Sequence, residues 1–422
     1  MNKGRIACFG ISLLMLGLAG RAAGTGFVFE NPQFSFQALR TAGYTASGGA
    51  DLGECLATCS RIGDGDVESW YSEWLVTASG AESTAADYLA AGCPVNAREC
   101  FFRASGYYRA AEFFLHVDPS DPRMTATWRK SVETFLDAAA LSALPVIPVE
   151  IPAGDWYVPG YLCLADTSGD VRPMILVHSG FDGTKEELYF ELGRFAVERG
   201  FDCLLFEGPG QGQVVREQGV RFRPDWEAAV TPVVDFVLDL PCVDPDRIAL
   251  VGYSMGGYLA PRAAAFEHRI AACVADGGIY SVYRSALDHN PPGTDAMLDD
   301  PGASAEYDAA VAGMMDDDLF VRWYYGNGMW AFGADSPSGF LRMMREYTLE
   351  GVVDRIDCPT LVLDSENDGM VSGQARVLFD SLDCPKEYFL FTEAAGADQH
   401  CQMGAASVSA EKILCWLETV MD

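Results

Sequence analysis

A serine between two closely spaced glycines gives the sequence GYSMG at residues 252–256, which has the G-x-S-x-G spacing of many serine nucleophiles. The motif follows an apolar segment, residues 247–251, that is typical of a buried strand, and it opens a helical pattern. Glycines at 252 and 256 let backbone segments approach closely in a sharp turn that raises the hydroxyl above a sheet. We therefore predict that Ser254 is a nucleophile. The alternative is a glycine-rich turn that serves only packing.

A serine hydroxyl needs a neighbouring base at neutral pH, and the sequence contains five histidines. In a strand–serine–helix site the acid and the base follow the serine along the chain, which argues against His116 and His178. His268 ends the helix that the serine begins, about 21 Å away at 1.5 Å per residue. His289 precedes any loop that could supply the acid. His400, between the last predicted strand and helix, is the predicted general base; the alternative is a surface histidine without a role.

The acid that orients the base is expected in a loop at the carboxyl end of a strand. Residues 360–364 form an apolar strand pattern, and residues 365–371 form the following loop. Asp368 lies within that loop and is the predicted acid. Asp364 and Glu366 lie nearer the strand and remain alternatives.

Acyl transfer also requires hydrogen-bond donors for the developing oxyanion. The N–H of Met255, directly after the serine, is one expected donor. The second is expected after the first buried strand, in residues 178–183, from Phe181 or alternatively Gly180. The sequence GPGQG at residues 208–212 lacks the Gly-Lys-Ser/Thr ending of a phosphate-binding loop and is interpreted as a structural turn beside the site.

Beyond residue 145, short apolar runs alternate with helical patterns, which is typical of parallel strands joined by helical crossovers. We predict an α/β fold with a mostly parallel central sheet covered by helices on both faces. A hairpin is predicted at 146–164, and the further strands are predicted at 174–178, 203–206, 247–251, 271–275, 360–364 and 387–391.

The alternation stops between about residues 279 and 349, and we predict a lid-like insertion there. This segment is rich in aromatic residues, including those at 323, 324, 325, 330 and 332. Aromatic side chains dominate buried cores, so we interpret the group as core packing. A lid over a pocket would have the same composition.

The N-terminal part divides into two segments. Residues 1–24 begin with basic residues, continue with an apolar run and end with small residues, which predicts a signal peptide and a secreted or periplasmic protein. The alternative, a membrane anchor, is disfavoured because the run is shorter than the roughly 20 residues that span a bilayer. Residues 25–144 have helical spacing and predict a helical cap, which leaves residues 145–422 as the catalytic domain.

Charge and cysteine content limit the possible partners. A net charge of −31 repels phosphate backbones, so no nucleic-acid partner is expected. No stable membrane span is expected after the signal is removed. No His-Glu-x-x-His and no paired Cys-x-x-Cys occurs, so no metal site is predicted. Of the 13 cysteines, Cys55, Cys59, Cys93 and Cys100 lie in the polar N-terminal region, where one or two disulfides are expected.

Several segments together resemble a known group, the α/β hydrolases related to 2,6-dihydropseudooxynicotine hydrolase and the FrsA-like esterases. The resemblance implies an α/β-hydrolase fold with a helical N-terminal cap, a triad of Ser254, Asp368 and His400, an active site between cap and sheet, and no cofactor. One branch of the group cleaves carbon–carbon bonds and uses an extra glutamate that residues 268–305 lack. The matching segments are residues 104–115, 180–188, 206–212, 252–261, 358–361 and 400–402.

These patterns favour a serine hydrolase that cleaves a small ester or related acyl compound through an acyl-serine intermediate. A cap and an aromatic lid favour small, partly apolar substrates, because a covered pocket excludes water and long polymers. The alternatives are a serine peptidase, a carbon–carbon bond hydrolase, and a non-catalytic binding protein on a hydrolase scaffold.

Overall fold

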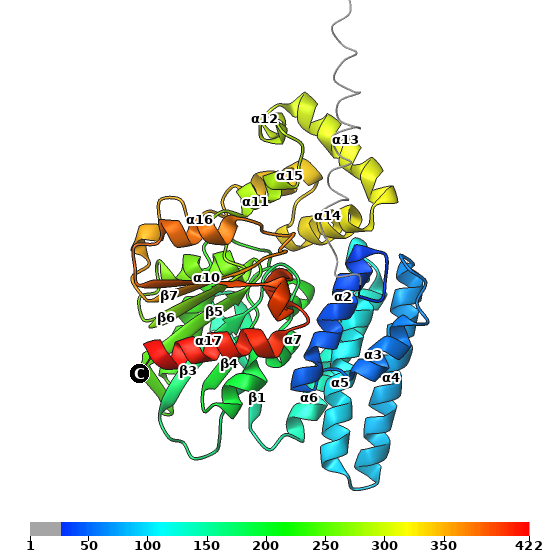
Figure 1. The fold of residues 1–422 in the computed structure, drawn as a ribbon, viewed down its shortest axis with the longest axis vertical. Coiled ribbons are helices and arrows are strands. Elements are labelled where there is room, and N and C mark those ends of the chain that lie inside the picture. The colour runs from blue at the N-terminus through cyan, green and yellow to red at the C-terminus, as the bar shows by residue number, and fades with distance from the viewer. Residues whose placement is uncertain (1–26, 422) are drawn as a thin grey trace, which may run out of the picture.

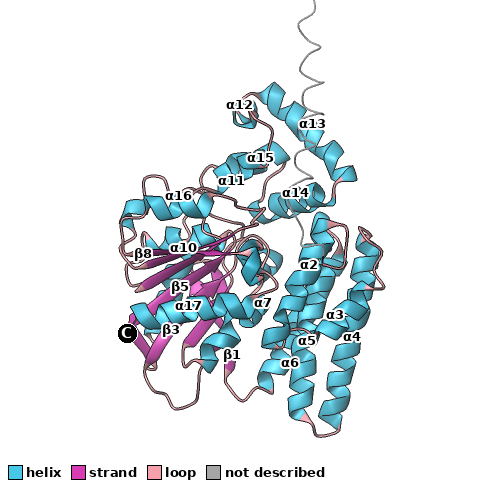
Figure 2. Cartoon of the chain, in the orientation of Figure 1, coloured by secondary structure: helices cyan, strands magenta, loops and turns pink. Residues whose placement is uncertain are grey.

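The central feature of the structure is an eight-stranded sheet with a helical bundle beside it and a group of helices above one edge (Figure 1 and Figure 2). This computed structural model describes residues 27–421. The predicted signal peptide, residues 1–24, lies outside the described residues.

The strands are arranged in the order β1-β2-β4-β3-β5-β6-β7-β8. The β1–β2 hairpin and the β2–β4 pair are antiparallel, and all other neighbours are parallel. This confirms the predicted mostly parallel sheet. The strands are β1 (Val146–Ala153), β2 (Trp156–Cys163), β3 (Arg172–His178), β4 (Asp202–Phe206), β5 (Val243–Tyr253), β6 (Ala272–Asp276), β7 (Thr360–Ser365) and β8 (Lys386–Phe391).

The inner strands are buried because helices cover both faces of the sheet. Successive residues of a strand point to opposite faces, so Leu176 and Val177 belong to two separate hydrophobic clusters. On the Val177 face the sheet packs against α7 (Lys185–Leu188), α8 (Arg194–Glu198), α17 (Ala406–Val420) and the cap. On the Leu176 face it packs against α9 (Glu227–Leu238), α10 (Gly256–Ala264) and α16 (Gln374–Ser381).

The N-terminal bundle consists of helices that begin with side-chain caps or proline. The Asn31, Asp51, Asp66 and Asp121 side chains accept backbone N–H bonds at the starts of four of them. Phe135 then joins the bundle to the sheet, because its ring stacks on Tyr161 of β2 with the centroids 4.7 Å apart. The helices are α2 (Pro32–Gly43), α3 (Leu52–Cys59), α4 (Val67–Ala90), α5 (Pro94–Glu112) and α6 (Pro122–Ala140).

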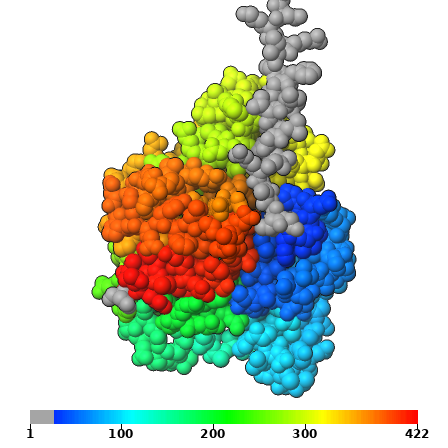
Figure 3. All heavy atoms as spheres, viewed as in Figure 1, coloured from blue at the N-terminus to red at the C-terminus, as the bar shows by residue number. Residues whose placement is uncertain are grey.

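The segment that interrupts the strand–helix alternation is helical and covers the carboxyl edge of the sheet. Figure 3 shows it as the yellow-green region above the orange C-terminal elements and the blue bundle. We call it the lid; helix α14 is its part closest to the bundle in Figure 1. Its helices are α11 (Val282–Asp288), α12 (Thr294–Leu298), α13 (Pro301–Asp317), α14 (Leu319–Phe332) and α15 (Pro337–Met344).

The expected N-terminal disulfides are wrong, because Cys55, Cys59, Cys93 and Cys100 are all free thiols. Cys55 and Cys59 lie one turn apart on α3 and pack side by side into the core of the bundle. Cys93 lies at the start of α5, and Cys100 lies two turns further along the same helix. At 1.5 Å per residue the two are about 10 Å apart along the helix axis. That spacing exceeds the reach of a disulfide.

No helix among residues 27–421 is long and apolar enough to cross a bilayer. Within the same residues, no cluster of three or more His, Cys, Asp or Glu side chains could hold a metal ion.

The ring of Phe135 is completely buried between the bundle and the sheet, so the substitution Phe135→Ala is expected to lower the free energy of unfolding by about 3 to 5 kcal/mol. The matched substitution Phe389→Ala removes a ring that is 37% exposed on β8, and about 1 kcal/mol or less is expected. Guanidinium unfolding followed by tryptophan fluorescence measures both. Equal losses in the two variants would show that the bundle–sheet contact is not a major source of stability.

Candidate active site

Ser254 lies at the end of β5 in a strained turn. Its φ angle is 61°, a left-handed conformation that costs free energy for any residue with a Cβ. A Cβ on Gly252 would lie 2.1 Å from the carbonyl oxygen of Gly256, so the turn requires glycine at 252. The tight turn leaves the serine hydroxyl at the carboxyl edge of the sheet, facing the lid.

The three predicted triad side chains meet although they are far apart in the sequence. Ser254 Oγ lies 2.8 Å from His400 Nε2, and His400 Nδ1 lies 2.7 Å from Asp368 Oδ2. Asp368 Oδ1 accepts bonds from the backbone N–H groups of Met370 and Val371. The carboxylate is thereby fixed, so that His400 donates its Nδ1–H to Asp368 and presents a lone pair to the serine hydroxyl.

The electrostatics of the pair favour an ionised acid. Burial raises the pKa of Asp368, but the charge of His400 and the bonds to its carboxylate outweigh burial, so the net shift is downward. Burial also lowers the pKa of His400, and here the charge of Asp368 outweighs it, so the pKa of the imidazole is raised. His400 is therefore a stronger base than a free imidazole.

The two backbone donors expected for an oxyanion belong to two loops that pack against each other. A Cβ on Gly180 would lie 2.4 Å from the backbone nitrogen of Met255, so the loop after β3 packs directly on the turn that carries Ser254. Within residues 27–421, neither the N–H of Met255 nor that of Phe181 donates to a protein acceptor. Both residues line the same pocket as Ser254, and neither N–H group has a protein acceptor that would compete with a ligand.

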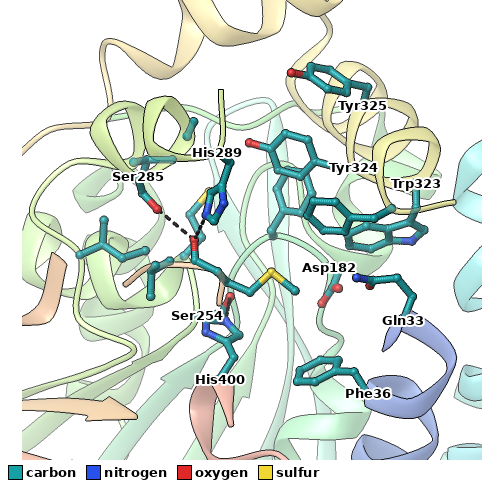
Figure 4. A pocket seen from close by; sticks show the side chains of 18 of the residues that line it. Gln33, Phe36, Asp182, Ser254, Ser285, His289, Trp323, Tyr324, Tyr325 and His400 are labelled. Atoms are coloured by element: carbon teal, nitrogen blue, oxygen red, sulfur yellow. Dashed lines mark hydrogen bonds between the residues drawn. The ribbon is translucent and has the colours of Figure 1, made fainter. Parts of the chain in front are cut away.

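A pocket of about 160 Å³ opens above the serine, between the sheet, the lid and α2 (Figure 4). Its apolar wall contains Trp323, Tyr324 and Tyr325 of α14. The interpretation of the lid aromatics as core packing is therefore incomplete. Trp323, Tyr325 and Phe332 do belong to the buried core, but Trp323, Tyr324 and Tyr325 also line the pocket, as in the alternative of a lid.

The pocket has polar groups at two places. On the α2 side, Arg40 Nη1 lies 3.2 Å from Asp182 Oδ1, and burial raises the pKa of the neighbouring Glu191 to about 7. On the lid side, Ser285 Oγ and His289 Nε2 both donate to the backbone oxygen of Met370 (Figure 4).

The remaining candidates from the sequence do not meet the triad. Asp364 accepts a bond from the hydroxyl of Tyr388, and Glu366 accepts one from the backbone of Glu393. Both alternatives for the acid are therefore engaged elsewhere. His289 lies in the pocket wall. Of the other histidines, His116 lies in a buried network, His178 lies beneath the loop after β3, and His268 lies beside Asp357 on the surface.

Sequence reasoning missed residues that hold the site from behind. Gln211 donates to the backbone oxygens of Ser179 and Gly180, at 2.6 and 3.1 Å. Gln402 donates to Asp276 Oδ1, and burial raises the pKa of Asp276 to about 7. The glycines of residues 208–212 predict the turn that contains Gln211, but no local pattern indicates which loop the Gln211 amide contacts.

The fold and the site define an α/β hydrolase with a helical cap. A family model described as "Alpha/beta hydrolase family" matches residues 174–406, more than half of the chain. The chain belongs to this family, and the protein is a hydrolase.

Two relatives extend the similarity over almost the whole chain. The "Hydrolase acrC" of Aspergillus aculeatus is 34% identical over 411 residues, which cover 91% of this chain and 96% of the relative. The "20-hydroxy-prefusarin hydrolase FUS2" of Gibberella moniliformis is 34% identical over 408 residues, with 93% and 97% covered.

Among solved structures, that of a 2,6-dihydroxy-pseudo-oxynicotine hydrolase matches with a TM-score of 0.69 and 22% identity, covering 90% of this chain and 95% of the other. This likeness concerns the fold, and it agrees with the resemblance noted in the sequence.

The pKa of His400 is expected to lie above the ordinary value of about 6.5, and the substitution Asp368→Asn is expected to lower it, because the neighbouring negative charge is lost. Because the folded-state pKa is raised, the pair stabilises the fold below about pH 6.5, and this contribution is lost as the pH rises through the folded pKa. NMR titration of the histidine ring protons measures the shift. An unchanged His400 titration in the variant would contradict the coupling.

Proposed function

We propose that the protein is a serine hydrolase that cleaves small, largely apolar acyl esters through an acyl-serine intermediate. Ser254 Oγ attacks the acyl carbon while His400 Nε2 takes its proton. The N–H groups of Met255 and Phe181 stabilise the oxyanion. His400 then gives the proton to the leaving alcohol, and a water activated by His400 releases the acid and regenerates the serine.

The single observation that carries the proposal is the hydrogen-bonded alignment of Ser254, His400 and Asp368 beside two unoccupied backbone donors in one pocket. Nucleophile, base, orienting acid and oxyanion donors are the four requirements of acyl transfer. A binding protein has no need of a serine in a strained left-handed turn, so the strain at Ser254 favours catalysis over binding.

The shape of the pocket limits the substrate. An apolar cavity of roughly 150 Å³ holds a molecule the size of benzene, so the space of about 160 Å³ fits an acyl group of similar size. The wall is mainly aromatic and aliphatic, with polar groups at Arg40 and Asp182 on one side and at His289 on the other. A compact apolar acyl group with a polar substituent fits this arrangement.

The relatives are consistent with a small-molecule substrate. One of them is named for hydrolysis of 20-hydroxy-prefusarin, and it is similar to this chain over 97% of its own length. We infer a substrate of comparable type, a small organic molecule with apolar and oxygenated parts, for this protein too.

A fluorophosphonate probe is expected to form one covalent adduct with the wild-type protein, located at Ser254 by peptide mass spectrometry. The substitution Ser254→Ala should abolish the adduct and lower kcat for p-nitrophenyl butyrate by at least about 10⁴-fold, because no nucleophile remains. Ser285→Ala is the matched control, since Ser285 lies in the same pocket and its loss should leave the adduct in place. An adduct that persists in Ser254→Ala would refute the assignment.

Acyl-group size provides a second test. Among p-nitrophenyl esters, kcat/KM is expected to be highest for butyrate and benzoate and at least about tenfold lower for palmitate, because the pocket holds about a benzene-sized group. Tyr324→Ala enlarges the pocket and should move the optimum to longer acyl chains. A maximum at palmitate in the wild-type protein would contradict the size limit.

A further inference from the structure

The loop that carries the second oxyanion donor, residues 179–182 after β3, is held by side chains from outside the sheet. Gln211 donates to the backbone oxygen of Gly180 at 3.1 Å. Residues 27–421 contain no cis peptide bond, so the N–H of Phe181 points opposite to that carbonyl and away from Gln211. This contact sets the direction of the peptide plane before Phe181.

The peptide plane after Phe181 is held by the lid. Asn327 of α14 donates its Nδ2–H to the backbone oxygen of Phe181 at 3.2 Å. The ring of Phe181 also lies against α14, with its centroid 5.9 Å from that of Trp323 and 5.7 Å from that of Tyr324. With both flanking peptide planes fixed, Phe181 has little freedom to rotate its N–H out of the oxyanion position.

The next residue is held by the cap. Arg109 of α5 donates to the backbone oxygen of Asp182 at 2.9 Å, and Arg40 of α2 pairs with the carboxylate of Asp182. Both guanidinium groups are buried. Displacement of the loop would break these contacts and leave a buried guanidinium group without a hydrogen-bond acceptor. Because that loss is costly, the two arginines resist movement of the loop.

The lid contact and the cap contact belong to one closed network. His116 Nδ1 lies 2.8 Å from Asn327 Oδ1, and His116 Nε2 lies 2.7 Å from Glu112 Oε2. Glu112 in turn accepts a bond from Arg109 at 2.7 Å. Because Arg109 also donates to the backbone oxygen of Asp182, the network begins and ends on the loop of residues 179–182. Because Asn327 Oδ1 accepts the hydrogen bond from His116 Nδ1–H, the amide group has one orientation, with Nδ2 toward Phe181. Asn327 and His116 are each 1% exposed, so water does not compete for these contacts.

We propose that Asn327 is a positioning residue for the N–H of Phe181, so that the cap and the lid together complete the oxyanion hole. This inference rests on the proposed acyl-serine chemistry. It assigns the helical cap a part in transition-state stabilisation in addition to covering the pocket.

The substitution Asn327→Asp tests the proposal, because it keeps the shape and the acceptor for His116 but removes the donor to Phe181. Loss of one oxyanion donor lowers kcat by about 10² to 10³-fold, and partial misplacement should lower kcat for p-nitrophenyl butyrate by about 10 to 100-fold. KM should change less than about threefold, since ground-state binding does not use this N–H. The affinity for an alkyl boronic acid, which forms a tetrahedral adduct with the serine, should fall by the same factor as kcat/KM.

A control variant separates positioning from general loosening of the lid. Ala331→Gly lies on the same helix, one turn beyond Asn327, and is outside the pocket lining; it weakens the helix by about 1 kcal/mol without touching the amide. Its melting temperature should fall while kcat stays within about twofold of wild type. If Asn327→Asp does not fold, Asn327→Ser, whose shorter side chain cannot reach Phe181, replaces it with the same expectation.

Three outcomes decide the matter. A selective loss of kcat and boronate affinity in the Asn327 variant supports the proposal. Wild-type kcat in that variant, or an equal kcat loss in Ala331→Gly, overturns it while the acyl-serine chemistry stands. A wild-type protein that is inert to the fluorophosphonate probe overturns the proposed function and this inference with it.

Discussion

Parallel pairing of the inner strands is the constraint on which the site depends. In a parallel sheet the carboxyl ends of neighbouring strands meet at one edge, so the loops after β3, β5, β6 and β7 leave the sheet side by side. These loops carry Phe181, Ser254 and Asp368. His400 reaches the same edge from the loop after β8, which pairs in parallel with β7. Were β7 to slip by one residue against β6, the acid loop would move by about 3.3 Å and the short bonds of the triad would be lost.

The cap is attached through buried charge as well as through apolar packing. Arg109 pairs with Glu187 and Glu112, and Arg40 pairs with Asp182 and Glu187. Removing such ions from water is expensive, and the cost is offset only when each charge keeps good partners. The arrangement therefore contributes specificity of orientation more than net stability. An apolar interface could slide by a small distance, whereas these fixed bonds place the cap at one position relative to the loop after β3.

Water exclusion gives these contacts their strength. Trp323, Tyr324 and Tyr325 form an apolar wall of the pocket above the serine, and the hydrogen-bond network behind that wall is buried. Hydrogen bonds and charges act more strongly in a dry environment than in water. The same aromatic helix therefore shapes the substrate pocket, supports the donor loop and lowers the local dielectric constant.

Much of the fold could be predicted from local patterns. The strand–helix alternation, the hairpin at β1 and β2 and the helical N-terminal region all depend on apolar periodicity and turn residues within short windows, and such information is local. Ser254, Asp368 and His400 were singled out by motif, by loop position and by elimination among few histidines. Scarcity made this possible, because only one histidine lies after the predicted acid loop.

Contacts between distant segments were decided only by the tertiary structure. The cysteine pattern predicts disulfides, but all four of those thiols are free in the structure, and the lid aromatics interpreted as core packing include three that also line the pocket. No spacing in the sequence indicates that Asn327, Gln211 and Arg109 hold three adjacent carbonyl groups. The sequence by itself determined the elements and the residue types able to do the chemistry, because these follow from local preferences. Which side chains orient the backbone donors depends on the packing of the cap and lid against one loop, and that exists only in the folded chain.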